Sequence, residues 1–119
     1  MMNYTVTLPW PSKDLSPNAR VHWSVKSKAA KALRKSAYVL TLEAGAAVDW
    51  EGDVHLFVDY YPPDRRARDV DNCIASSKAI FDGVADALGV NDRRFRLHPN
   101  LRLDIGGMVK IKIVQGPQA

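Results

Sequence analysis

One uninterrupted segment of helix-forming residues constrains the fold of this chain more than any other feature. From Val25 to Ala44 the sequence contains neither glycine nor proline, and alanine, lysine, leucine and arginine dominate it. These residues have high helix propensity, and the apolar ones recur at spacings of three and four, as they do on the buried side of a helix. We therefore predict a helix from Val25 to about Ala46, with Ser24 as its N-cap.

Strand-like segments surround this helix. Alternating apolar, β-branched and aromatic residues predict four strands, at residues 3–8, 54–61, 94–103 and 108–114. Pro99 interrupts the third of them and indicates an edge strand or a bent strand, because proline has no N–H to donate to a ladder. Gly106 and Gly107 predict a hairpin turn that joins the last two strands.

A second helix is predicted between the second and third strands. It begins near Asp71, with Asp71 or Asn72 near the cap, and runs to about Leu88, where Gly89 is a favourable C′ residue. The order βαβαββ in 119 residues predicts a single α+β domain spanning residues 1–119. We expect a mixed sheet of about four strands with two helices packed on one face.

Composition excludes several classes of protein. A single cysteine, Cys73, rules out an internal disulfide and a cysteine-rich zinc cluster, and we expect it to be a core residue. The apolar stretches are much shorter than the ~20 residues of a membrane span, so no membrane association is expected. A reducing, cytoplasmic setting fits best, and the net charge of +4 favours polyanionic partners.

The candidate chemistry concentrates at Asp69 and Asp71. If this segment is extended, the two carboxylates point the same way, and a divalent cation between them would relieve their repulsion. Oxygen ligands of this kind suit Mg²⁺, with Mn²⁺ as a substitute. The alternative is a charged turn in which Asp71 only caps a helix. Three cations beside the acids favour a site that brings a metal to a phosphate backbone: Arg65, Arg66 and Arg68.

Two further residues are open to two interpretations each. Lys78 lies seven residues after Asp71, almost two helical turns, so both would project from one helix face. It either stabilises charge on a cleaved phosphodiester or is an ordinary solvated lysine. Asp92 follows the second helix and is either a turn residue or a third acid, provided that the turn returns beside Asp71.

Taken together, these motifs resemble the RusA-type Holliday-junction resolvases, which are endonucleases common in phages and prophages. The similarity covers most of the chain. It is carried by Leu8-Pro9-Trp10-Pro11, by Ser16-Pro17-Asn18-Ala19-Arg20-Val21-His22-Trp23, by Arg68-Asp69-Val70-Asp71-Asn72, by Lys78, by Phe81-Asp82-Gly83-Val84 and by Asn91-Asp92. Two departures are an asparagine, Asn91, where members often have a first acid, and a lysine about two turns after the acids, where some members have it after one.

The resemblance implies a role for each matching residue. Asp69, Asp71 and Asp92 would bind Mg²⁺, Lys78 would act in catalysis, and a homodimer would nick two strands of a four-way DNA junction symmetrically, in recombination and repair. Contacts to DNA are expected from the side chains of Arg20, Lys26, Arg65, Arg66, Arg68, Asn72 and Lys78.

Two rival functions need no cleavage. The chain could be a module that grips junctions or other nucleic acid through its basic face, with the acids only capping and balancing charge. It could also be a metal-free structural or regulatory protein of a mobile element. Dependence on Mg²⁺ separates these hypotheses from the endonuclease, because binding alone tolerates EDTA.

Overall fold

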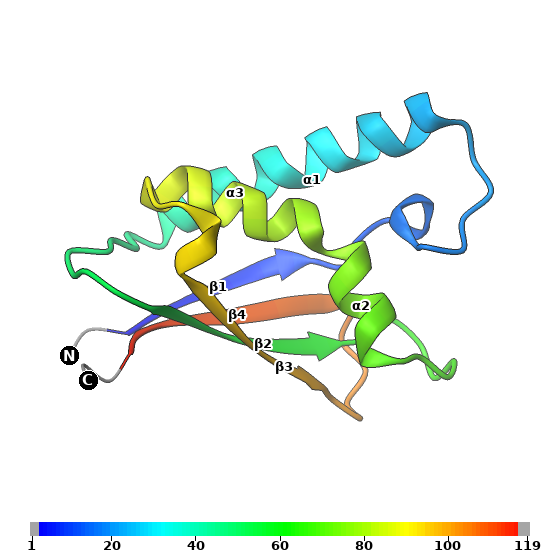
Figure 1. Ribbon diagram of the computed structural model, residues 1–119. Coiled ribbons are helices and arrows are strands. Elements are labelled where there is room, and N and C mark those ends of the chain that lie inside the picture. Colours follow the sequence, from blue (N-terminus) through cyan, green and yellow to red (C-terminus); the bar gives the residue numbers. More distant parts are fainter. Residues whose placement is uncertain (1–2, 117–119) are drawn as a thin grey trace.

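The computed structural model describes residues 3–116, which form a four-stranded sheet with helices on one face (Figure 1). The predicted α+β class is therefore confirmed. In chain order the elements are β1 (Tyr4–Pro9), the 3-10 helix η1 (Lys13–Leu15), α1 (Trp23–Glu43), β2 (Val54–Tyr61), α2 (Val70–Ser76), α3 (Lys78–Leu88), the 3-10 helix η2 (Asp92–Arg94), β3 (Phe95–Leu101) and β4 (Met108–Gln115).

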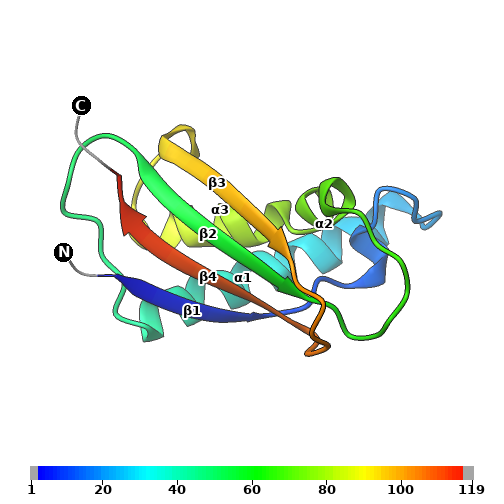
Figure 2. The same ribbon diagram turned by 90° about the horizontal axis from the view of Figure 1, so that it is seen from below.

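The sheet has the strand order β1-β4-β2-β3, so the last strand lies in its interior (Figure 2). β4 pairs antiparallel with β1 and β2, while β3 pairs parallel with β2. The predicted hairpin between the last two strands is therefore wrong. The connection passes around the end of β2 instead, where the Gly106 amide donates to the Pro62 carbonyl and the Gly107 amide to the Tyr61 carbonyl, both at 2.8 Å.

β3 is an edge strand, as Pro99 predicts. The amide of Arg102 donates to the Tyr60 carbonyl, so even-numbered residues of this segment direct their backbone groups toward β2. Pro99 is odd-numbered and faces the free edge, where its missing N–H removes no bond from the ladder.

The core lies between the sheet and the helices. Alternate residues of β2 point inward and are buried, from Val54 to Tyr60, and they pack with buried residues of α1 and α3 such as Leu33 and Ile80. Figure 1 shows α1 and α3 side by side above the sheet, and Figure 2 shows all four strands in front of them. One face of the sheet is therefore covered by helices.

No helix formed by residues 3–116 covers the opposite face, which we call the open sheet face (Figure 2). His98 of β3 stacks on Phe57 of β2 at 4.5 Å between ring centroids, and it also stacks on His55. The Nδ1 atom of His55 and the Nε2 atom of His98 are 2.7 Å apart and share a hydrogen bond. Lys112 of β4 lies directly beside Phe57 in the ladder. This face therefore combines stacked rings with positive charge.

The predicted second helix is divided at Ser77. Ser77 is completely buried, and its hydroxyl donates to the Cys73 carbonyl at 2.8 Å. The Tyr60 hydroxyl lies 2.6 Å from the Ser77 Oγ atom. Its backbone, at φ −104° and ψ 12°, leaves the α-helical region and ends α2. A hydroxyl that bonds both the preceding turn and the neighbouring strand thus breaks the helix.

The first helix begins two residues before the predicted start. His22, and not Ser24, is its N-cap, because the His22 ring Nδ1 accepts from the Ser24 amide at 3.1 Å. Leu33 and Ala37 are buried in the core, as the predicted spacing requires. Ala44 lies after the end of the helix and is exposed.

Candidate functional site

The two acids of the central motif lie in the first turn of α2, just beyond the end of β2. Asp69 is the N-cap, with an extended backbone, and its carboxylate accepts from the Asn72 amide at 3.1 Å. Asp71 is in the first helical turn, and both side chains are exposed. The predicted cap at Asp71 or Asn72 is therefore two or three residues late. The condition for side-by-side carboxylates, an extended segment, is not met, because Asp71 is already helical.

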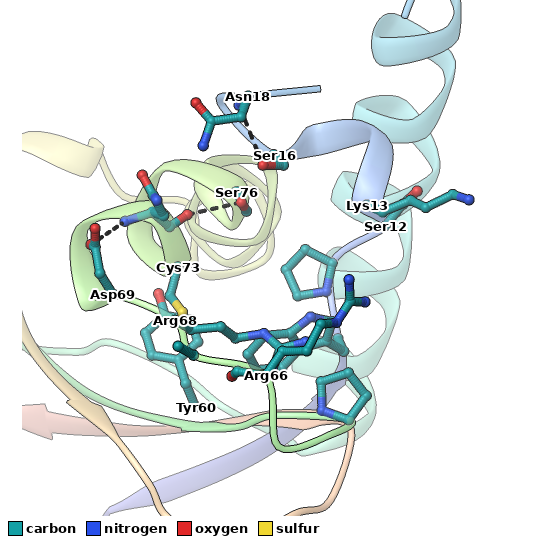
Figure 3. Close-up of a pocket in the computed structure, with 15 residues that line it drawn as sticks. Ser12, Lys13, Ser16, Asn18, Tyr60, Arg66, Arg68, Asp69, Cys73 and Ser76 are labelled. Atoms are coloured by element: carbon teal, nitrogen blue, oxygen red, sulfur yellow. Dashed lines mark hydrogen bonds between the residues drawn. The ribbon is translucent and has the colours of Figure 1, made fainter. Parts of the chain in front are cut away.

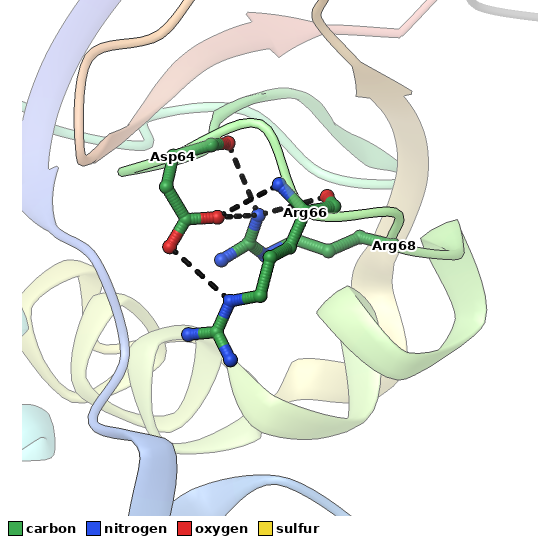
Figure 4. A network of polar contacts seen from close by, with 3 residues as sticks. All are labelled: Asp64, Arg66 and Arg68. Carbon is green, nitrogen blue, oxygen red and sulfur yellow. Dashed lines mark hydrogen bonds and ion pairs between the residues drawn. The ribbon is translucent and has the colours of Figure 1, made fainter.

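A network of polar contacts fixes the loop that precedes these acids (Figure 4). The Asp64 carboxylate accepts from the Arg66 amide and from the Arg68 guanidinium, both at 2.9 Å. The same guanidinium nitrogen also donates to the carbonyls of Asp64 and Arg66. Arg68 is only 18% exposed, whereas Arg66 is 83% exposed. Arg68 therefore holds the loop, and Arg65 and Arg66 are the arginines that extend toward solvent.

This network gives Asp64 an unusual acidity. The Arg68 guanidinium and the Arg66 amide lower the pKa of Asp64 from 3.8 to about 2. The carboxylate pairs only when ionised, so its contribution to stability is present above pH 4 and is lost as the pH falls from about 4 through about 2. We expect an NMR titration of the Asp64 carboxyl carbon to show a midpoint near 2.

The matched variant for this titration is Arg68→Gln. It should raise the Asp64 midpoint toward 3.8, while Asp86, whose pKa is lowered by Arg34 on the other side of the molecule, should titrate as before. An Asp64 midpoint that stays near 2 in the variant would show that Arg68 does not hold this carboxylate.

A cavity of about 670 Å³ opens beside Asp69 (Figure 3). Its walls come from the segment after β1, the end of β2, the Asp64–Arg68 loop and α2. Its lining combines cations, hydroxyl and amide groups and aromatic rings: Trp10, Lys13, Ser16, Asn18, Tyr60, Arg66, Arg68, Asp69, Asn72 and Ser76 are among the residues. Asp69 thus borders a concave surface on which cations outnumber acids.

The sequence patterns, taken residue by residue, do not predict most of one cavity wall. Residues 10–18 are a loop rich in proline, serine and asparagine, and no spacing rule assigns them to a site. The available signal is the resemblance, which includes Trp10, Ser16 and Asn18. Of the predicted DNA-contacting residues, Arg66, Arg68 and Asn72 line the cavity, and Arg20 is exposed on the segment before α1.

Lys78 does not lie over the acids. Because the helix is divided at Ser77, Lys78 starts α3 and the predicted common face with Asp71 does not exist. It lines a second, smaller cavity of about 260 Å³ together with Asp82 and Ser76. Ser76 also lines the first cavity, so the two are neighbours.

Asp92 lies at the other end of the sheet from Asp69 and Asp71. It starts η2, directly before β3, and Phe95 pairs with Val54 at the start of β2. Asp69 shares its cavity with Tyr60 near the end of β2, about one strand length or ~20 Å away. Metal ligands must lie within ~4 Å of one another. The turn therefore does not bring Asp92 back to the other acids within one chain.

Other residues within 3–116 do not complete a three-acid metal site with Asp69 and Asp71 either. Among residues 3–116 no group of three or more His, Cys, Asp or Glu side chains is arranged to hold a metal ion. Mg²⁺ is commonly bound by only one or two carboxylates, with waters and substrate phosphates as the other ligands, so Asp69 and Asp71 remain its candidate ligands. Oxygen donors that face solvent suit such an ion.

α1 contains five lysine and arginine residues, but not all of this positive charge is unpaired. Arg34 of α1 makes a two-pronged ion pair with Asp86 of α3, at 2.7 and 2.9 Å. Lys26 is half-buried near the start of α1. Cys73 is buried, as predicted for a core residue, and burial raises the pKa of its thiol.

Comparison with known proteins gives one informative match. A protein of Xylella fastidiosa strain Temecula1, described as an uncharacterized protein, is 48% identical over 114 residues, which cover 92% of this chain and 74% of that protein. No family model matches the chain. Among the described residues, no helix has the length and apolar character needed to cross a membrane.

Proposed function

The chain belongs to the same family as the Xylella fastidiosa protein, and we propose that it is a Mg²⁺-dependent endonuclease that resolves four-way DNA junctions by paired symmetric nicks. One observation carries this proposal. Asp69 lines a cavity whose walls also supply Lys13 and Arg66, and the exposed Asp71 lies two residues further along, in the first turn of α2. Acids beside cations are the combination needed to hold a metal ion against a phosphate. The resemblance to RusA-type resolvases supports the same activity.

The reaction is hydrolysis of a phosphodiester, which adds water and leaves one hydroxyl end and one phosphate end. A divalent ion, when bound, supplies acidification of water and polarisation of the phosphate. Asp69 and Asp71 would hold that ion, and the Asn72 amide fixes the position of the Asp69 carboxylate. Lys13 and Arg66 would attract the DNA backbone, and Lys78 in the neighbouring cavity would contact the next phosphate along the strand.

The separation of the acids supports a composite site in a dimer. β3 has a free edge and runs from Asp92 at its start to the side of the sheet that carries α2. If two β3 edges approach antiparallel across a two-fold axis, Asp92 of one protomer moves next to Asp69 and Asp71 of the other. Two equivalent sites result, as the near two-fold symmetry of a four-way junction requires. Exposed Leu97 and the odd-numbered backbone groups of the edge are available for this contact.

The activity itself is tested with a labelled four-way junction and a matched linear duplex, each with Mg²⁺ or with EDTA. Paired nicks in the junction alone, abolished by EDTA, are the expected result. Equal cleavage of the linear duplex would contradict the proposed selectivity for branched DNA.

Mixing of inactive variants tests the composite site. Asp71→Asn and Asp92→Asn proteins should each be inactive, but a mixture that exchanges protomers should regain cleavage. The heterodimer then holds one site with both substitutions and one with none, so it should nick only one strand of each junction. If each protomer contained its own complete site, every site in the mixture would lack an acid and the mixture would stay inactive.

A second function is favoured by one observation. The described chain holds no complete three-acid group, which fits a protein that grips branched DNA through its basic cavity without cutting it. Tight junction binding in EDTA, with no cleavage under either Mg²⁺ or Mn²⁺, would establish this alternative.

A further inference from the structure

Three side chains in the large cavity have properties that phosphate binding does not require. Trp10, Asn18 and Asn72 line the cavity and supply an indole ring and two side-chain amides, from the segment after β1 and from α2. An anion site needs only cations and N–H donors. Aromatic and amide groups beside cations are typical of sites that hold an unpaired base.

The indole of Trp10 is held rigidly. The Tyr60 ring meets it edge-on, with 6.1 Å between centroids and an angle of 82° between the planes. The Arg68 guanidinium lies over the ring at 5.4 Å. Tyr60 is completely buried, and Asp64 fixes Arg68, so both neighbours are immobile. A ring fixed in this way loses little conformational freedom when a base packs against it.

The two amides are available for hydrogen bonds. Within the part of the chain that the structure describes, neither the Asn18 nor the Asn72 side-chain amide has a hydrogen-bond partner. The position of Asn72 is nevertheless fixed, because its backbone amide donates to Asp69 and its carbonyl accepts from the Ser76 hydroxyl at 2.8 Å. Each amide offers both donors and an acceptor, which match the edges of nucleobases.

Charge supplies the remaining recognition element. Lys13 and Arg66 are both exposed at the cavity, and Asp69 is the carboxylate in its lining. The volume of about 670 Å³ is in the range of about 300–1,000 Å³ that is usual for small-molecule sites. We propose that this cavity binds one unpaired nucleotide, with its base against Trp10, the base edge on Asn18 and Asn72, and its phosphate near Lys13 and Arg66.

This inference rests on the proposed function and extends it. A nucleotide drawn out of a branched substrate into this cavity would be adjacent to Asp69, and so to the phosphodiester that is to be cut. Unpairing is least costly at a branch point, where stacking is already interrupted. The cavity would therefore read both the branch and the identity of one base.

The first test is an NMR titration of the intact protein in EDTA, which needs no cleavage. The probes are deoxycytidine 5′-monophosphate, deoxycytidine and inorganic phosphate. The nucleotide should shift the Trp10 indole signal and both asparagine amide signals, and it should bind at least about tenfold tighter than either fragment. Equal affinity for inorganic phosphate would reduce the cavity to an anion site and overturn the proposal.

Two variants sharpen this titration. Asn18→Ala and Asn72→Ala remove exposed side chains and should each weaken nucleotide binding by about fivefold or more. The matched control is Asn3→Ala, which removes an exposed amide just before β1 and outside the cavity lining, and which should leave the affinity unchanged. Equal effects of all three substitutions would contradict a site in the cavity.

Photocrosslinking then tests whether the nucleotide comes from branched DNA. A four-way junction with 5-iododeoxyuridine at a branch position, again in EDTA, should crosslink to Trp10, and a linear duplex should not. Crosslinks confined to Phe57 and His98 would move base recognition to the open sheet face and overturn the proposal. Cleavage without a Trp10 crosslink would preserve the proposed function alone, whereas a crosslink without cleavage would preserve only the nucleotide site.

Discussion

Asp69→Asn should lower the rate of junction cleavage by at least about 100-fold while junction binding stays within about twofold of the wild type. Asparagine caps helices as well as aspartate does, so the hydrogen bond from the Asn72 amide should survive. The variant thus removes the negative charge without removing the cap. The measurements are single-turnover cleavage in Mg²⁺ and junction affinity in EDTA.

Two comparisons make this result specific. Asp71→Asn, in the same helical turn, should show a similar loss, whereas Asp104→Asn, on the exposed loop before β4, should cleave at the wild-type rate. Unchanged melting temperatures would exclude unfolding as the cause. An Asp69→Asn protein that cleaves at the wild-type rate would falsify the metal-binding assignment and leave Asp69 with its capping role alone.

Gly83→Ala should destabilise the fold by about 2–3 kcal/mol, which for a domain of this size lowers the melting temperature by about 10 °C. A Cβ atom at Gly83 would lie 2.7 Å from the Ala37 Cβ and even nearer the Arg34 carbonyl oxygen. Alanine favours the helix by about 1 kcal/mol, but a backbone carbonyl in a neighbouring helix cannot move aside alone. The steric cost should therefore outweigh the gain in helix propensity.

Ala32→Gly is the control for the propensity part of this prediction. Ala32 is exposed on α1, so its replacement should cost only about 1 kcal/mol. Thermal unfolding of the wild type and the two variants gives both numbers. A Gly83→Ala protein at least as stable as the wild type would show that α1 and α3 can separate without cost.

Local features of the fold could be predicted from the sequence. The β2 strand matches the predicted range at both ends, because alternating residues mark its faces and Pro62 ends it. The division of the second helix could not be predicted. It depends on Ser77 meeting the buried hydroxyl of Tyr60, a residue that lies 17 positions earlier in the sequence. Nothing in the pattern around Ser77 indicates that partner.

The order of the strands in the sheet also could not be predicted from local sequence patterns. Two glycines between two strand-like segments are typical of a hairpin, yet Gly106 and Gly107 bond to the end of β2. The burial of β4 between β1 and β2 places the connection there. Only the pairing of distant segments decides this arrangement.

The candidate site, too, could be predicted from the sequence only in part. Asp69 and Asp71 are two residues apart, so any local conformation keeps them near each other. Whether Asp92 joins them depends on where α3 ends, and α3 carries the chain to the opposite end of the sheet. The wall formed by residues 10–18 likewise depends on tertiary packing, so sequence spacing alone leaves the cavity unseen.

The interior position of β4 has a consequence for the order in which the protein assembles. β1 and β2 have no direct pairing, and β1 is joined to the sheet through β4, with Tyr4 opposite Ile113. β1 therefore has no ladder partner until β4 has been made, whereas β2 can pair with β3 before that. Folding that depends on contacts between residues so distant in the sequence is slow. The cavity wall that follows β1 is therefore held in the fold through the pairing of β1 with β4, although β4 itself lines no part of the cavity.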